Sequence, residues 1–226
     1  MVTMTIMEAI KERHSVRSYM DKKLSPEIIS QLQNEINICN QESGLNIQLV
    51  MNEPKAFDNF MAHYGKFSGV QNYIALIGKK SSELDEKIGY YGERIALFVQ
   101  MLGLNTCWVA MTFSKGTTKS KCQINTGEKL VCVLALGYGE SQGVPHKSKG
   151  IEDVCKMNGK MLEWFQNGMT SVLLAPTASN QQKFLLTLEG KNVSVKSTGG
   201  FYSKVDLGIV RYHFEVGAGT ENFNWK

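Results

Sequence analysis

The sequence predicts an α+β or α/β domain built around one central sheet. Segments with apolar residues at helical spacing alternate along the chain with short apolar runs typical of strands. One such run, residues 130–136, is apolar at every position, which indicates a strand covered on both faces. With 226 residues, of which 42% are hydrophobic and 20% charged, the chain is long enough to bury a core without disulfides or a structural metal.

Two helices are expected near the N-terminus. Thr5 and Glu8 have the spacing of a capping box, which predicts a helix over residues 6–14. Ser25 followed by Pro26 is a second helix start, and the apolar residues after it recur at helical spacing. These residues are Ile28, Ile29, Leu32, Ile36 and Cys39.

Two strands and a long helix follow. Residues 47–51 and 73–77 are short apolar runs and are predicted to be strands. The strongest helical pattern covers residues 86–102, and Gly103 is expected to end that helix. Its apolar stripe consists of Ile88, Tyr91, Ile95, Phe98 and Leu102.

The pattern partly repeats in the last third of the chain. A helix over residues 161–175 and a strand over 184–188 follow in the same order as the elements within 28–51. Residues 91–98 of the long helix can be superposed on residues 207–214. We therefore expect a first unit over residues 1–155 and an abbreviated second unit over 156–226, which form an internal pseudo-dimer or one continuous domain.

Composition argues against several classes of protein. The formal charge of +4 is mild and no block of like charges occurs, so a nucleic-acid partner is not expected. No apolar run is long enough to span a membrane and no signal-peptide pattern begins the chain, which favours a cytoplasmic protein without a membrane partner. The five cysteines lack Cys-x-x-Cys spacing and the four histidines are scattered, so a metal site is not expected.

One short stretch is rich in groups that bind anions. Residues 13–19 contain two arginines, a histidine and two serines at the exit of the first predicted helix. Guanidinium groups are planar, permanently charged donors that suit phosphate oxygens. A small anionic ligand is the functional interpretation, and a solvated surface is the alternative.

Four stretches together resemble the FMN-dependent nitroreductase family. They are residues 13–19, residues 102–109, the basic pair in 147–149 and the proline-containing turn in 175–182. The resemblance implies an α+β, nitroreductase-like fold with a central, mostly antiparallel sheet flanked by helices. It also implies bound FMN, NAD(P)H as electron donor and a small-molecule electron acceptor.

The order of these motifs departs from that of ordinary family members. The proline turn is expected soon after the arginine motif, but residues 40–44 at that place contain no proline. The second unit has the turn and lacks an Arg-x-Ser-x-Arg stretch. The chain is therefore similar to the single-chain subgroup of the family, which implies one flavin site per chain and a monomer or weak homo-oligomer.

The resemblance assigns fourteen residues to the flavin, and physical chemistry supports several of them. Arg13 and Arg17 suit the phosphate or the pyrimidine edge of the ring, and the amides of Asn180 and Gln182 can pair with that edge because each carries a donor and an acceptor. The full set is Arg13, His14, Ser15, Arg17, Val109, Ala110, Met111, Lys147, Lys149, Pro176, Thr177, Ala178, Asn180 and Gln182. The alternatives are an ordinary turn at 176–182 and surface lysines at 147 and 149. Trp108 is expected to pack in the core.

The functional hypothesis is an FMN-dependent oxidoreductase that passes electrons from NAD(P)H to nitroaromatic, quinone or similar acceptors. No catalytic side chain is expected, because the flavin supplies the chemistry. The alternative is a ligand-binding protein of the same fold with little flavin turnover. A dinucleotide site at Gly137 to Gly143 is disfavoured because the spacing is Gly-x-Gly-x-x-x-Gly and Pro145 stands where a helix should start.

Overall fold

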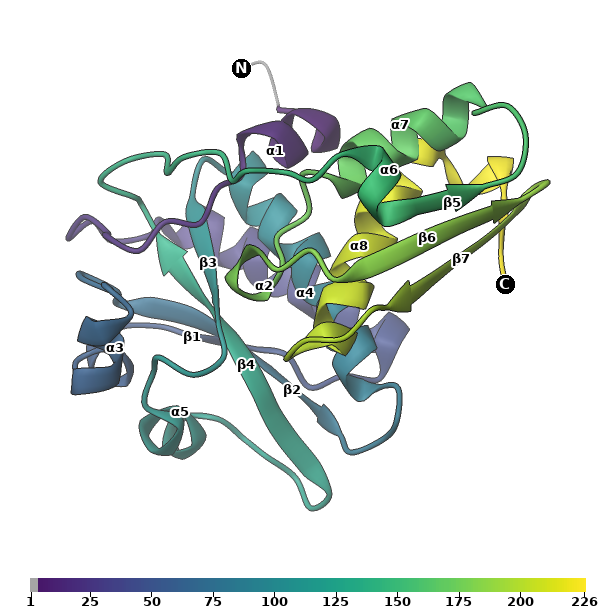
Figure 1. Ribbon diagram of the computed structural model, residues 1–226. Coiled ribbons are helices and arrows are strands. Elements are labelled where there is room, and N and C mark those ends of the chain that lie inside the picture. The colour runs from purple at the N-terminus through teal and green to yellow at the C-terminus, as the bar shows by residue number, and fades with distance from the viewer. Residues whose placement is uncertain (1–3) are drawn as a thin grey trace.

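The chain folds into two sheets with helices between and around them (Figure 1). The computed structural model describes residues 4–226. The sequence predicted a single central sheet, whereas the structure has two of four strands each. Within the described residues, no helix has both the length and the apolar character needed to cross a bilayer.

The first sheet is antiparallel throughout. In spatial order its strands are β1 (Gln48–Val50), β2 (Asn72–Lys79), β4 (Glu128–Gly137) and β3 (Asn105–Val109). Side chains alternate between its faces, so that Leu134 contributes to one apolar cluster and Val133 to the other. The continuous apolar run of residues 130–136 is thereby explained, and the prediction of a strand covered on both faces is confirmed.

Different helices cover the two faces of this sheet (Figure 1). On one face lie α4 (Leu84–Met101) and, beyond it, α2 (Pro26–Ser43). The short helices α3 (Phe60–Tyr64) and α5 (Lys115–Lys121) lie on the other side, near the 3-10 turn η1 (Pro54–Ala56). A cluster of aromatic side chains, Phe57, Phe67, Tyr73 and Phe113, fills that second face.

The second sheet has mixed strand directions. Its order is β5 (Cys155–Met157), β6 (Phe184–Glu189), β7 (Asn192–Ser197) and β8 (Asn224–Trp225), with β6 and β7 antiparallel and the outer pairs parallel. Its associated helices are α6 (Ile151–Val154), α7 (Glu163–Val172) and α8 (Ser203–Ala218). The 3-10 turns are η2 (Ala178–Asn180) and η3 (Thr220–Asn222).

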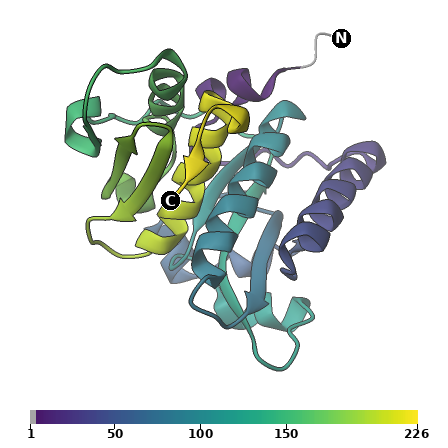
Figure 2. The same cartoon turned by 90° about the vertical axis from the view of Figure 1, so that its right-hand side faces the viewer.

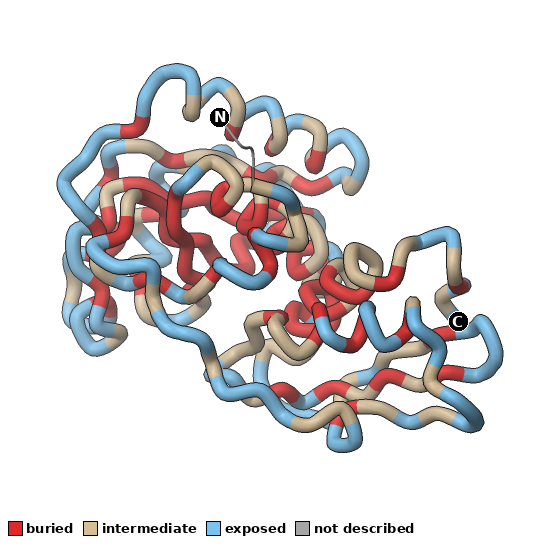
Figure 3. The backbone as a smooth tube through the Cα atoms, turned by 90° about the horizontal axis from the view of Figure 1, so that it is seen from above, coloured by how far each residue is buried: buried red, intermediate tan, exposed pale blue. Residues whose placement is uncertain are grey.

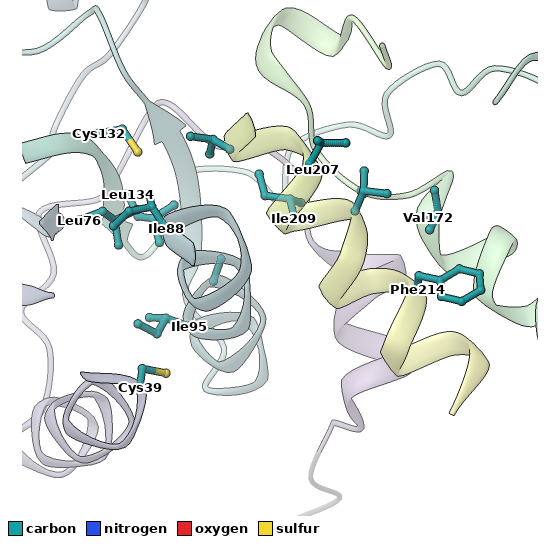
Figure 4. Packing of buried hydrophobic residues seen from close by; sticks show 14 of the residues in the cluster. Cys39, Leu76, Ile88, Ile95, Cys132, Leu134, Val172, Leu207, Ile209 and Phe214 are labelled. Atoms are coloured by element: carbon teal, nitrogen blue, oxygen red, sulfur yellow. The ribbon is translucent and has the colours of Figure 1, made fainter. Parts of the chain in front are cut away.

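Helices α4 and α8 lie side by side and join the two halves (Figure 2). They approach closely at Gly89 and Gly208, since a Cβ on Gly89 would collide with the Val205 carbonyl and a Cβ on Gly208 with the Glu86 carbonyl. In Figure 4, α4 residues face the first sheet and α2, while Phe214 on α8 faces α7. One continuous apolar cluster therefore crosses from one half to the other.

The observed boundaries agree well with several predicted elements. Helix α1 (Ile6–Glu12) begins with the predicted capping box, in which the Glu8 amide donates to the Thr5 hydroxyl and the Glu8 carboxylate accepts from the Thr5 amide. It ends before His14, because Arg13 has extended backbone angles of φ −73° and ψ 114°. The predicted strand over 184–188 is confirmed, and the helix predicted over 161–175 is shorter.

Strand β3 was not predicted. The sequence interpretation treated residues 102–109 as a helix end and a loop, but residues 105–109 pair with β4. The polar residues Asn105 and Thr106 interrupt the apolar sequence pattern of this strand, although both are buried. Figure 3 shows how buried positions gather inside each half, with exposed connections around them.

Candidate functional site

The arginine motif runs from the end of α1 along the start of β3. The Val16 amide donates to the Thr106 carbonyl at 3.0 Å, which fixes the extended backbone of the motif beside the strand. Ser15 and Arg17 are exposed and His14 is half-buried. Arg13 is not part of a solvated surface, the alternative considered for this motif, because only 3% of it is exposed.

The guanidinium of Arg13 faces a buried carboxylate. Its Nε lies 3.4 Å from Oε1 of Glu93, which is fully buried on α4. Neither Nε nor Nη1 of Arg13 has a hydrogen-bond partner, although both are buried. Unmatched buried donors cost free energy. The arginine therefore retains the capacity to donate to an anion.

Glu93 has two further partners. Its Oε2 accepts from the indole N–H of Trp108 at 2.8 Å, and its Oε1 lies 3.0 Å from Nε2 of His213. Burial alone would raise the pKa of the carboxyl, but the charge of Arg13 and the bonds to His213 and Trp108 hold that pKa below its usual value. Trp108 thus packs and bonds inside the protein, as expected from the sequence.

A second histidine lies near the motif. His146 places Nε2 at 3.1 Å from the Leu173 carbonyl. Burial lowers the pKa of both His14 and His146, and the positive charge of Arg13 lowers each further. The segment after β4 therefore lies close to the arginine motif, as it must if residues 147–149 are to share a ligand with it.

The proline turn has a tightly determined backbone. Ser179, Asn180 and Gln182 all have positive φ, at 48°, 54° and 46°. Such angles are uncommon outside glycine and are held by surrounding contacts. The carboxylate of Asp206 on α8 supplies two of them, accepting from the Ala178 amide at 2.9 Å and from the Gln181 side chain at 2.7 Å.

The turn is bonded directly to the lysine segment. The side chains of Asn180 and Gln182 both donate to the Lys147 carbonyl at 2.9 Å. The Lys149 amide donates to Oε1 of Gln182 at 2.8 Å, and its ammonium donates to the Gln182 carbonyl at 2.9 Å. The structure therefore brings together two motifs that stand apart in the sequence.

These bonds change the interpretation of two amides. Gln182 is 4% exposed and both ends of its side-chain amide are occupied within the protein, so it fastens the turn to the lysine segment. Asn180 is exposed but also uses its amide nitrogen in this way. Pro176, Thr177 and Ala178 are partly exposed.

The third predicted segment is only partly a loop. Val109 is the buried last residue of β3, which corrects its expected place in a loop. Ala110 is half-buried and Met111 is 58% exposed, so the chain leaves the sheet at these two residues.

Sequence reasoning missed Glu93, His213 and Asp206, which organise this region. A weak signal existed for Glu93, since a charged residue within a strongly apolar helix is unusual unless it is paired. A cavity of about 90 Å³ lies elsewhere, beside the segment from Tyr19 to Leu24, and none of the fourteen predicted flavin residues lines it.

The comparisons with known proteins identify the family. Residues 5–218 match the family described as "Putative TM nitroreductase", and the chain belongs to this family. The nitroreductase class that the motifs indicated is therefore established. A comparison with curated proteins found no match.

Solved structures share the fold. A putative nitroreductase from Thermotoga maritima has a TM-score of 0.66 and 23% identity, over 96% of this chain and 85% of that one. A putative nitroreductase in complex with FMN from Desulfovibrio desulfuricans has a TM-score of 0.53 and 16% identity, over 66% and 94%. An FMN and NADPH-dependent nitroreductase from Sphigopyxis sp. strain HMH has a TM-score of 0.52 and 14% identity, over 66% and 97%. The α+β, nitroreductase-like fold is thereby confirmed.

Proposed function

We propose that this protein is an FMN-dependent oxidoreductase of the cytoplasm. It takes electrons from NAD(P)H and passes them to nitroaromatic, quinone or similar electron-poor acceptors. The proposal rests mainly on the hydrogen bonds that join the turn at 176–182 to Lys147 and Lys149. Nitroreductase structures of the same fold include one in complex with FMN and one described as FMN and NADPH-dependent.

The residues present fit FMN on two grounds. Arg13 has buried N–H groups without a hydrogen-bond partner, and such donors suit a phosphate. Three exposed residues lie in neighbouring segments: Ser15 and Arg17 follow Arg13 in the same motif, and Lys147 belongs to the lysine segment. Pro176, Thr177 and Ala178 are partly exposed and can therefore contact the flavin ring, and the backbone of Ala110 and Met111 offers donors at the end of β3. When bound, FMN accepts a hydride and returns electrons to an acceptor. The chain's own task is to hold the cofactor and keep one face of the ring open.

We further propose that the chain is a fused pseudo-dimer and works as a monomer. The contacts of Gly89 with Val205 and of Gly208 with Glu86 are reciprocal, as an approximate two-fold axis between α4 and α8 requires. In the structure, Gly208 lies against Gly89. The sequence repeat aligned Gly208 with Gly92, which comes about one helical turn later in α4. The proposed units are residues 1–155 and 156–226.

One observation favours a second candidate, a ligand-binding protein with little flavin turnover. The charge of Arg13 is partly offset by Glu93, so less of it is available to a phosphate than the motif implied. A weakly held cofactor would follow.

The visible absorption of the purified protein tests the first proposal. We expect flavin bands, release of FMN on denaturation, and oxidation of NADH or NADPH when a quinone or nitroaromatic is added. An Asn180→Ala variant should retain less FMN, while Lys183→Ala, an exposed neighbour, should retain as much as the wild type. Flavin binding without turnover would favour the second candidate, and a colourless protein that takes up no added FMN would exclude the enzyme.

A further inference from the structure

A single carboxylate, that of Glu93, connects three separate segments of the chain. It is fully buried in the middle of α4. Its oxygens contact Arg13 at the end of α1, Trp108 on β3 and His213 on α8. A buried carboxylate is costly unless it is paired and hydrogen-bonded, and each of these contacts offsets that cost.

The hydrogen-bond geometry determines where the protons lie. Nδ1 of His213 is 2.9 Å from the Ser171 carbonyl, which only accepts, so Nδ1 carries a hydrogen. Nε2 is 3.0 Å from Oε1 of Glu93, and one proton must lie between them. The guanidinium of Arg13 beside the same oxygen favours the carboxylate, which places that proton on His213. Arg13, Glu93 and His213 then carry two positive charges and one negative charge.

Each contact of Glu93 leads to a different part of the proposed flavin site. Arg13 opens the arginine motif, and Trp108 directly precedes Val109, where β3 ends. His213 extends the chain of bonds to Ser171 in α7, the helix that leads to the proline turn. The three segments come from both halves of the chain, so their relative placement depends on contacts of this kind.

We propose that Glu93 is the positioning residue of the flavin site and that it holds His213 as an imidazolium. It aligns Arg13 and the end of β3 with the proline turn, and it leaves the cluster with one net positive charge. The N–H groups of Arg13 that lack partners can then donate to the cofactor's phosphate. This inference rests on the proposed function.

FMN titration of the apoprotein tests the positioning role. Glu93→Gln keeps the shape of the side chain but removes its charge, and we expect the Kd for FMN to rise at least about tenfold. The matched control is Glu86→Gln on the same helix, which removes an ion pair of 2.9 Å with Arg211 between α4 and α8. The control should bind FMN like the wild type, because the Glu86 carboxylate contacts none of Arg13, Trp108 and His213.

Nitrogen-15 NMR of the histidine rings tests the proton assignment without flavin. In the wild type at neutral pH, we expect one ring with both nitrogens protonated. The signal is assigned to His213 when it persists in the His14→Asn, His63→Asn and His146→Asn proteins. In Glu93→Gln the doubly protonated signature should disappear, a change that a merely structural role for Glu93 would not require.

The outcomes separate this inference from the proposed function. If the wild type binds FMN and Glu93→Gln binds it equally well, or if His213 is singly protonated in the wild type, the inference is overturned and the proposed function stands. If the wild type binds no FMN, both are overturned. Should Glu93→Gln fail to fold, Trp108→Phe removes the indole N–H together with part of the packed ring while leaving Glu93 in place, and we expect about threefold weaker FMN binding. Unchanged binding in that variant would overturn the positioning role.

Discussion

Individual polar residues decide how the motifs of this protein are arranged. Gln182 and Asp206 are buried and each bonds two backbone or side-chain groups across the fold. The resemblance assigned Gln182 to the flavin edge, whereas the structure occupies its amide with the lysine segment. Motif matching identifies such residues, but the direction of a side chain depends on partners far along the chain.

Gln182→Ala should destabilise the protein by about 2–3 kcal/mol, because it leaves the Lys149 amide, which lies in a partly buried hydrogen bond, without its acceptor and removes a donor to the Lys147 carbonyl. Urea unfolding followed by circular dichroism measures the change. Lys183→Ala, at the exposed next position, should stay within about 0.5 kcal/mol of the wild type. Equal stabilities of the two variants would show that the amide does not tie the turn to the lysine segment.

Glu128 gives a pH-dependent prediction. Burial would raise the pKa of its carboxyl, but the Asn125 amide and the Asn46 side chain, each 2.8 Å from Oε2, bring that pKa below the ordinary value of 4.5. A lowered folded-state pKa stabilises the protein above pH 4.5, and this contribution is lost as the pH falls through the folded value.

Glu128→Gln should therefore be less stable than the wild type by about 1 kcal/mol near neutral pH, and the difference should shrink below pH 4.5. Urea unfolding at several pH values measures it. The control is Glu140→Gln at an exposed position, which should show no such narrowing. A difference that stays constant down to low pH would contradict the role of the carboxylate charge.

Among the elements, the crossing of α4 and α8 matters most for the shape of the molecule. The apolar stripe of α4 was predicted from the sequence and packs as expected against the first sheet. The place where α8 crosses α4 was not predicted, because glycine contributes nothing to a hydrophobic pattern. Gly89 and Gly208 allow backbone contact that any side chain would prevent.

Gly208→Ala should destabilise the protein by about 2 kcal/mol or more, since the new Cβ would collide with the Glu86 carbonyl. Gly116→Ala is the matched control in helix α5, where a Cβ would meet no atom within 4 Å. It should be neutral or stabilising by up to about 1 kcal/mol, because alanine favours the helix. Thermal and urea unfolding of the two variants give the comparison, and similar losses in both would argue against close packing at the crossing.

At the scale of the whole molecule, one apolar cluster spans the proposed units. It includes Leu32 and Ile95 in the first unit and Phe165 and Phe214 in the second. Figure 4 shows Ile95 and Phe214 among these residues. Neither unit can bury its share of this surface alone. Folding of the two halves is therefore expected to be cooperative.

A protein with Trp164→Phe and Trp225→Phe keeps only Trp108, in the first unit, as a fluorescent reporter. Its fluorescence transition in urea should coincide with the transition seen by far-ultraviolet circular dichroism, which reports on both units. The wild type provides the reference midpoint. Two separate transitions would indicate that residues 1–155 and 156–226 are independent domains.

Elements whose signals are local in the chain could be predicted from the amino-acid pattern alone. The capping box at Thr5, the long apolar stripe of α4 and the doubly covered strand β4 depend on residues near one another in the chain, so their spacing was sufficient. The four motifs also identified the nitroreductase family, which the family comparison confirmed.

Contacts between segments that are distant in the chain could be seen only in the three-dimensional structure. Strand β3 depends on pairing with β4, and the two-sheet arrangement depends on the close crossing of α4 and α8. The burial of Arg13 against Glu93 depends on a helix that begins far along the chain. Such contacts arise from long-range packing and the need to satisfy buried charges, and no spacing within a local window records them.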